Sequence, residues 1–176
     1  MLTLLLLSIL PFADVAVPGG HEGARDAAAS VAERRATMYR AMLQALAPMV
    51  EAGELQVEIR QGVMRAVLPS DALFETGKSQ LLAEGRRRVT ALARGLASIQ
   101  ATRLSVIGYT DDGSPDSRTS KSALSSARAR AVRQLLAHGK VAVTATDAGD
   151  GDPRAPNDTD EGRQRNRRIE VLVLID

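Results

Sequence analysis

Hydrophobic and polar residues follow two periods along this chain, and each period predicts a different kind of element. Alternation at every second position, with β-branched residues, marks a strand, whereas apolar residues every three or four positions mark an amphipathic helix. The helical period predicts helices over 25–53, 79–100 and 120–138 and a short helical turn over 158–165. Strands are predicted over 55–60, 63–68, 103–108, 141–148 and 168–175, with Gln61-Gly62 as a hairpin turn.

The order of these elements predicts the fold class. A helix and a hairpin come first, followed by helix, strand, helix, strand and strand. Strands that alternate with amphipathic helices form an α/β layer, and right-handed crossovers place successive helices on the same side of the sheet. We therefore expect an α/β (α+β) fold in which helices cover one face of a small mixed sheet. The 176 residues suit one domain with an appendage.

The chain begins with an apolar run from Leu2 to Phe12, which is too short to cross a bilayer but has the length of a signal-peptide core. Residues 1–17 are therefore expected to be a signal peptide or a short membrane anchor, with export as the favoured interpretation. No Lys or Arg precedes the run, and Asp14 lies close to a cleavage site near Ala16, so a buried strand or helix stays an alternative. Pro and Gly recur in residues 18–24, which indicates a linker.

The expected helix over 25–53 has a broad apolar face made of two neighbouring stripes. The stripes contain Val31, Met38, Met42, Ala45 and Met49, and Tyr39, Leu43, Leu46 and Val50. Such a face can pack on its own domain, or it can form a stalk, a homodimer contact or a contact with an envelope partner. Arg35 interrupts the stripe, and we therefore favour packing within the domain.

Composition excludes several kinds of chemistry. The chain has no Cys, which excludes disulfides, thiolate metal sites, a Cys nucleophile and lipid attachment to an N-terminal Cys. Two His cannot form a His-rich metal site, and 2% aromatic residues are too few for a row of base-stacking platforms. The net charge of +2 is only mildly basic. We therefore expect no metal, no cofactor and no nucleic-acid partner.

The most informative charged residues are Asp111 and Arg128. Asp111 follows the end of a predicted strand, where α/β sheets present ligand groups, and Arg128 falls in the apolar stripe of the next helix. A buried guanidinium needs a partner. A carboxylate that accepts from an ammonium and an arginine that grips a carboxylate would suit a zwitterionic ligand. Spacing alone leaves open the alternative that the two residues form a structural salt bridge with each other.

Four segments in order resemble the OmpA C-terminal-like family of peptidoglycan-binding domains, which includes the periplasmic domain of the flagellar stator subunit MotB. They are Ala-Leu-Phe-Glu-Thr-Gly at 72–77, Val-Ile-Gly-Tyr-Thr-Asp at 106–111, Leu-Ser-Ser-Ala-Arg-Ala at 124–129, and the Asn, Thr, Gly-Arg and Asn-Arg-Arg positions within 156–170. Each motif is weak alone, but four in this order are a specific match. The resemblance covers about Leu55 to Ile175 and implies a β-α-β-α-β-β sandwich as a domain over 54–176.

This resemblance also implies a function and a site. Members of the family bind the stem peptide of cell-wall peptidoglycan and grip its diaminopimelate side chain. The implied protein is a non-catalytic periplasmic module that anchors an envelope protein or complex to the wall. The implied ligand-binding residues are Asp111 with the neighbouring Thr110, Arg128, and the pair Asn166 and Arg167.

Two positions depart from the family pattern. Tyr109 stands where the family usually has His, and its phenol can keep a hydrogen bond there. Lys121 stands where the family usually has Asn, and an ammonium cannot accept a hydrogen bond, which puts the preference among wall peptides in doubt. We expect Lys121 to be exposed to solvent, with contact to a ligand carboxylate as the alternative.

Other functions have less support. A MotB-like stator or another envelope-complex subunit is the main alternative, but a stator subunit needs a full transmembrane helix with a proton-carrying Asp, and Asp14 ends a run too short for one. A hydrolase that uses Asp111 with Asp112 or Asp116 would lack an accompanying Ser-His-Asp set, metal cluster or phosphate loop. We therefore predict that the protein is not an enzyme.

Overall fold

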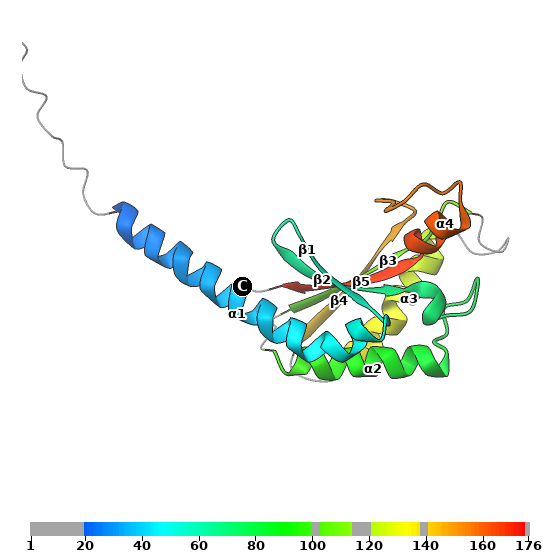
Figure 1. Ribbon diagram of the computed structural model, residues 1–176. Helices are drawn as coiled ribbons and strands as arrows, with labels where there is room; N and C mark the ends of the chain where they lie inside the picture. Colours follow the sequence, from blue (N-terminus) through cyan, green and yellow to red (C-terminus); the bar gives the residue numbers. More distant parts are fainter. Residues whose placement is uncertain (1–19, 100–102, 114–120, 138–140, 175–176) are drawn as a thin grey trace, which may run out of the picture. The chain divides into compact units, whose positions relative to one another are not determined.

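The computed structural model describes residues 20–99, 103–113, 121–137 and 141–174 (Figure 1). The predicted signal peptide or anchor over 1–17 lies outside these residues. The chain divides into the units Met1–Arg34 and Arg35–Asp176, and the second unit holds the sheet. The elements in order are α1 (Gly20–Glu51), β1 (Gln56–Arg60), β2 (Val63–Pro69), the 3₁₀ turn η1 (Ser70–Ala72), α2 (Ala83–Ala97), β3 (Arg103–Tyr109), α3 (Lys121–Leu136), β4 (Ala142–Gly149), α4 (Asp160–Asn166) and β5 (Arg168–Leu174).

The strands form one sheet in the order β1-β2-β5-β3-β4. The last strand of the chain, β5, lies between β2 and β3 and is antiparallel to both, whereas β3 and β4 are parallel. The predicted mixed sheet is therefore confirmed. Insertion of β5 in the middle brings the residues just before it, at the end of α4, beside the end of β3.

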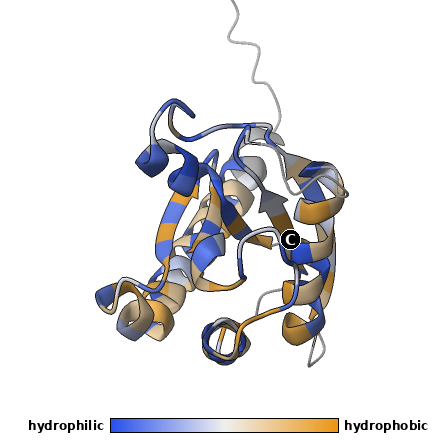
Figure 2. Cartoon of the chain, turned by 90° about the vertical axis from the view of Figure 1, so that its right-hand side faces the viewer, coloured by the Kyte–Doolittle hydropathy of each residue, from blue (hydrophilic) through white to orange (hydrophobic). Residues whose placement is uncertain are grey.

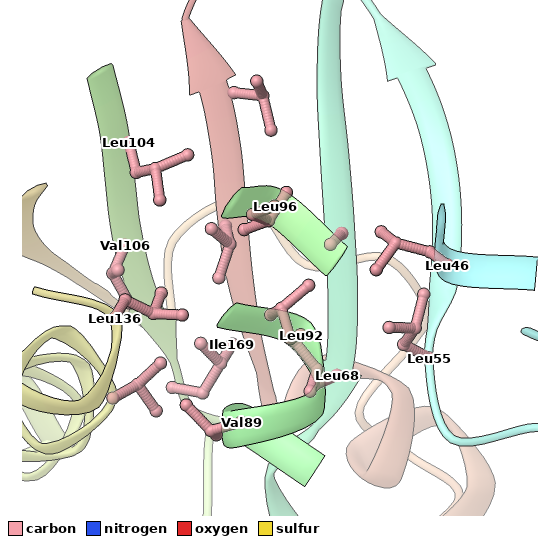
Figure 3. Packing of buried hydrophobic residues seen from close by; sticks show 14 of the residues in the cluster. Leu46, Leu55, Leu68, Val89, Leu92, Leu96, Leu104, Val106, Leu136 and Ile169 are labelled. Atoms are coloured by element: carbon pink, nitrogen blue, oxygen red, sulfur yellow. The ribbon is translucent and has the colours of Figure 1, made fainter. Parts of the chain in front are cut away.

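Helices α2 and α3 cover one face of this sheet, and their apolar stripes meet the inward side of the central strands in a single core. Figure 3 shows side chains of α2 pointing toward β2 and β5, with α3 residues on one side of them and α1 residues on the other. The labelled residues are Leu46, Leu55, Leu68, Val89, Leu92, Leu96, Leu104, Val106, Leu136 and Ile169. In Figure 2 hydrophobic and hydrophilic residues are mixed in the long helices, whereas the short helix α4 is hydrophilic, as expected of helices with one buried face and of a surface turn.

The part of α1 that belongs to the compact unit packs on it. Met42 and Leu46 are fully buried and Met49 nearly so. For this part of the helix the packing interpretation of the apolar face is therefore correct. Leu43 and Val50, on the neighbouring stripe, stay 47% and 40% exposed. Among the described residues, no helix has both the length and the apolar content needed to cross a bilayer.

The turn between β1 and β2 follows the prediction from Gln61-Gly62. Both residues have positive φ angles, 54° and 73°, which is the backbone of a type I′ hairpin turn. This turn matches the twist of the paired strands, and Glu58 of β1 thereby lies opposite Arg65 of β2. Tyr39 of α1 donates a hydrogen bond to the Gly62 carbonyl and ties the turn to the helix.

Two predicted boundaries are wrong. Helix α2 begins at Ala83 rather than at 79, because Leu81 pairs with Phe74 in an isolated antiparallel bridge that keeps this segment extended. Helix α1 begins at Gly20, so residues 20–24 of the predicted linker are helical. A glycine costs a helix about 1 kcal/mol relative to alanine, which is too little to stop one that continues into an alanine-rich segment.

Candidate functional site

Asp111 lies just beyond the C-terminal end of β3 in a loop that is held by backbone contacts. The Thr110 N–H donates to the carbonyl of Gly149 at the end of β4, at 2.7 Å. The Asp111 side chain accepts from the N–H of Gly113 at 3.2 Å and is 15% exposed. These contacts present one carboxylate at the edge of the sheet, as predicted from its place after the strand.

Arg128 is buried in α3, with only 3% of the residue exposed. Its Nε donates to the carbonyl of Lys78 at 2.8 Å and its Nη2 to that of Glu75 at 3.2 Å. The guanidinium also lies over the Phe74 ring, 5.1 Å from the centroid. Burial lowers the pKa of Arg128. Within the described residues Arg128 contacts two carbonyls and a ring and forms no ion pair with a carboxylate.

Close packing of β3 on α3 brings these two residues to one place. A Cβ atom at Gly108 would lie 2.2 Å from the carbonyl oxygen of Ser125, far inside van der Waals contact. Glycine therefore allows strand and helix to approach three residues before Asp111 and three residues before Arg128. This contact sets how far apart the two walls of the site stand.

Arg167 links the two acidic residues of the site. It follows α4 directly and forms a two-pronged ion pair with Asp71, with Nη2 to Oδ2 at 2.6 Å and Nε to Oδ1 at 3.0 Å. Its Nη1 donates to Asp111 Oδ2 at 2.5 Å. The hydrogen bond with Asp71 raises the pKa of Arg167, burial opposes this, and the hydrogen bond with Asp111 adds to the increase.

These residues border an open cleft of about 660 Å³. Its walls come from the segment after β2, the loop after β3, the start of α3 and the end of α4. The lining residues are Asp71, Thr76, Gly77, Lys78, Thr110, Asp111, Gly113, Lys121, Leu124, Arg128, Arg163 and Arg167. The Thr110 hydroxyl is buried there and has no hydrogen-bond partner among the described residues. It is thus a polar atom available to a bound molecule.

Four of the five residues predicted for the site line this cleft, and Asn166 does not. Asn166 is 1% exposed and holds the loop before α4. Its Oδ1 accepts from the N–H groups of Arg154 and Ala155, and its Nδ2 donates to Ala155 O and Asn157 Oδ1. The alternative of a salt bridge between Asp111 and Arg128 is not observed, because Asp111 pairs with Arg167 and Arg128 with carbonyls.

The two departures from the family pattern have different places. Tyr109 is 5% exposed, does not line the cleft, and packs its ring against the guanidinium of Arg168 at 3.6 Å from the centroid. Burial raises the pKa of its phenol. Lys121 lines the cleft with 28% of its side chain exposed, so the expectation of a solvent-exposed lysine is corrected.

Sequence reasoning missed Asp71, Lys78 and Arg163. Asp71 stands in the Pro69-Ser70-Asp71 turn and Lys78 follows the Leu-Phe-x-x-Gly segment, but nothing in their local pattern shows that β5 brings Arg167 to Asp71. Arg163 donates to the carbonyl of Asn157 at 2.6 Å. Among the described residues no group of three or more His, Cys, Asp or Glu could hold a metal ion.

A model of the OmpA family matches residues 73–167, which is more than half of the chain and includes every residue that lines the cleft except Asp71. The chain belongs to the OmpA family. The family resemblance carried by the four sequence segments is thereby confirmed.

Individual proteins and solved structures are also similar to this chain. Outer membrane porin F of Pseudomonas fluorescens is 38% identical over 106 residues, which cover 58% of this chain and 32% of that protein. A protein from Desulfovibrio vulgaris described as MotB-like has a similar structure, with a TM-score of 0.74, 26% identity and coverage of 82% of this chain and 93% of that one. The cell wall anchor of the T6SS from Pseudomonas aeruginosa has a TM-score of 0.67, 26% identity and coverage of 77% and 97%. The chain spans less than two thirds of the length of porin F and of two further curated relatives that it matches.

Proposed function

We propose that this OmpA-family protein binds cell-wall peptidoglycan without catalysis and anchors an envelope protein or complex to the wall. The ligand is the diaminopimelate end of the stem peptide, which carries one ammonium and one carboxylate. The observation that carries this proposal is the cleft itself, in which Asp111 and Arg128 face the same space without pairing with each other.

Each charged group of the ligand has a counterpart in the cleft. The ammonium meets Asp111, whose two carboxylate oxygens each accept one hydrogen bond, from Gly113 and from Arg167, and each keep a lone pair able to accept another. The carboxylate meets Arg128, whose guanidinium is oriented by the carbonyls of Glu75 and Lys78. Thr110 lines the same cleft with a hydroxyl that has no partner among the described residues, and Asn166 acts indirectly by holding the loop before α4.

Co-sedimentation of the full chain with insoluble peptidoglycan sacculi tests this function. Asp111→Ala and Arg128→Ala should each lower retention at least tenfold, as expected when one partner of a buried charged contact is lost. Asp158→Ala and Arg130→Ala are the matched controls, because both residues are exposed and lie outside the cleft. Unchanged retention in both cleft variants, with circular dichroism spectra like the wild type, would contradict the proposal.

The second candidate is a subunit of a MotB-like or other envelope complex. Similarity to the MotB-like protein covers 82% of the chain, which is more than the family segment 73–167. Leu43 and Val50 of α1 lie seven residues apart on one side of the helix, are exposed, and offer a contact to a second copy or an envelope partner. Light scattering of the full chain and of Leu43→Glu would reveal a dimer that the substitution dissociates.

Export to the periplasm belongs to the same proposal, with residues 1–17 as signal peptide or short anchor. Wall binding requires this compartment, and the relative named above is an outer membrane protein. Fractionation of cells and N-terminal sequencing of the mature protein would distinguish cleavage near Ala16 from retention of the apolar segment. Recovery of the intact chain from the cytoplasm alone would argue against export.

A further inference from the structure

Lys121 gives the cleft a second positive pole. It is the first residue of α3 and stands seven positions before Arg128, so the two residues lie on the same side of the helix. Seven residues correspond to about 10 Å along a helix axis. Both line the cleft. The α3 wall therefore has one buried guanidinium and, about two turns away, one ammonium at the rim.

The Lys121 ammonium is oriented by the protein but keeps donor capacity. Its Nζ donates to the carbonyl of Asp112 at 2.6 Å and to Asp150 Oδ2 at 2.9 Å. An ammonium has three N–H donors, and its contacts with the described residues engage two of them. The Asp150 side chain is 51% exposed, and an exposed pair of this kind is weak and easily rearranged. The hydrogen bond from Lys121 lowers the pKa of Asp150, so that partner stays charged near neutral pH.

The charges deeper in the cleft are already matched to a zwitterion. Asp71 and Asp111 share Arg167, and Arg128 supplies the second positive charge, so these four groups sum to zero. A ligand with one ammonium and one carboxylate leaves them balanced. The ammonium and the carboxylate of this ligand are attached to the same carbon atom. This end of the ligand is therefore too small to contact Lys121 as well. A group that contacts Lys121 must therefore belong to the neighbouring unit of the ligand.

We propose that Lys121 makes the cleft selective for stem peptides with a second free carboxylate, on the acidic residue next to diaminopimelate, over peptides in which that carboxylate is an amide. This inference rests on the proposed function of the cleft. The free carboxylate accepts a charge-assisted hydrogen bond from the Lys121 ammonium, and the amide offers only a neutral oxygen. The residue at position 121 thus determines which form of the wall peptide is preferred.

Calorimetric titration of the full chain with two soluble stem peptides tests this selectivity. The peptides are identical except that the carboxyl group next to diaminopimelate is free in one and amidated in the other. The wild type should bind the free acid about fivefold more tightly, as expected of one partly exposed charged contact. Lys121→Gln should reduce this ratio to about one, whereas Lys121→Arg should retain it.

The ratio of affinities within each variant is the measured quantity, so a general weakening of the cleft cancels. Arg130→Gln is the matched control, because Arg130 is an exposed cation on the same helix that does not line the cleft. It should keep the wild-type ratio. Equal binding of both peptides by the wild type, or an unchanged ratio in Lys121→Gln, would overturn the inference and leave the proposed function intact. Absence of binding of either peptide by the wild type would instead contradict the proposed function.

Discussion

The cleft and the outer face of the sheet are both built from arginines and carboxylates, but their charges are paired in different ways. In the cleft, the hydrogen bonds of Arg128 to the described part of the chain go to backbone carbonyls. On the outer face, Glu170 of β5 is fully buried and accepts from Arg65, Arg154 and Arg168, each at 2.7 Å. Glu170 lies on this face because its neighbours Ile169 and Val171 point into the core.

The outer cluster extends over several elements. Arg154 also pairs with Glu58 of β1, and Arg60 forms a two-pronged ion pair with Asp152 in the loop after β4. Burial alone would raise the pKa of Glu170, but the hydrogen bonds from Arg168 and Arg65 outweigh it, so the pKa lies below its usual value. Four arginines and three carboxylates therefore compensate one another across β1, β2, β5 and one loop.

The comparison shows what separates a binding site from a structural network made of the same residue types. A carboxylate that three guanidiniums saturate has no capacity left for a ligand, and it stabilises the fold only while all partners are present. A guanidinium held by carbonyls has no ion pair of its own, and its burial has a cost in stability that a bound carboxylate can offset. The following variants test this difference.

The largest effect is expected from Glu170→Gln. An amide cannot neutralise three surrounding guanidiniums, and breaking a buried ion network by removing one partner costs about 3 kcal/mol or more. Urea denaturation at pH 7 measures this loss of unfolding free energy. Retention of the folded protein on sacculi should stay at the wild-type level. A variant with normal stability but lost retention would show that the network, rather than the cleft, binds the wall.

The same variant gives a pH dependence. Because the folded-state pKa of Glu170 lies below its ordinary value of 4.5, its contribution is fully present above about pH 4.5 and is lost as the pH falls through the folded-state pKa. The difference in unfolding free energy between wild type and Glu170→Gln should therefore shrink between pH 6 and pH 3. A difference that stays constant over this range would mean that Glu170 does not titrate with folding.

A smaller effect is expected from Arg128→Lys. The charge is kept, but an ammonium cannot hold the carbonyls of Glu75 and Lys78 and also grip a carboxylate at two points. Affinity for a stem peptide should fall by about tenfold, or about 1.4 kcal/mol. Calorimetric titration measures this change, and urea denaturation checks that stability falls by less than in Glu170→Gln. Wild-type affinity in this variant would show that Arg128 does not contact the ligand.

The smallest effect is expected from Asp71→Asn. Arg167 loses its two-pronged partner but keeps its hydrogen bond to Asp111, so the cleft stays assembled. Affinity should change by about twofold, as expected of a partly exposed ion pair. A loss of tenfold or more in the same titration would mean that Asp71 itself contacts the ligand.

Much of the fold and part of the site could be predicted because they follow from local patterns. The inward stripe of α3 correctly placed Arg128 in a buried position, and the end of β3 correctly placed Asp111 at the edge of the sheet. The start of α2 at Ala83 could not be predicted, because it depends on the bridge between Phe74 and Leu81. This bridge pairs residues across a turn and produces no periodic pattern in the sequence. Asn166 was predicted in the site, since its neighbour Arg167 lies there, but adjacent residues point in different directions.

By itself, the amino-acid sequence determined the periodicity of the helices and strands, the lack of cysteine chemistry and the family to which the chain belongs, because side-chain spacing and motif order are properties of neighbouring residues. The tertiary structure alone decided which charges meet. Insertion of β5 between β2 and β3 brings Arg167 to Asp71 and Asp111, residues 96 and 56 positions away in the chain. Among the residues that the structure describes, Arg128 is thereby left without an ion-paired carboxylate, since pairing across a sheet depends on strand order, which local pattern does not encode.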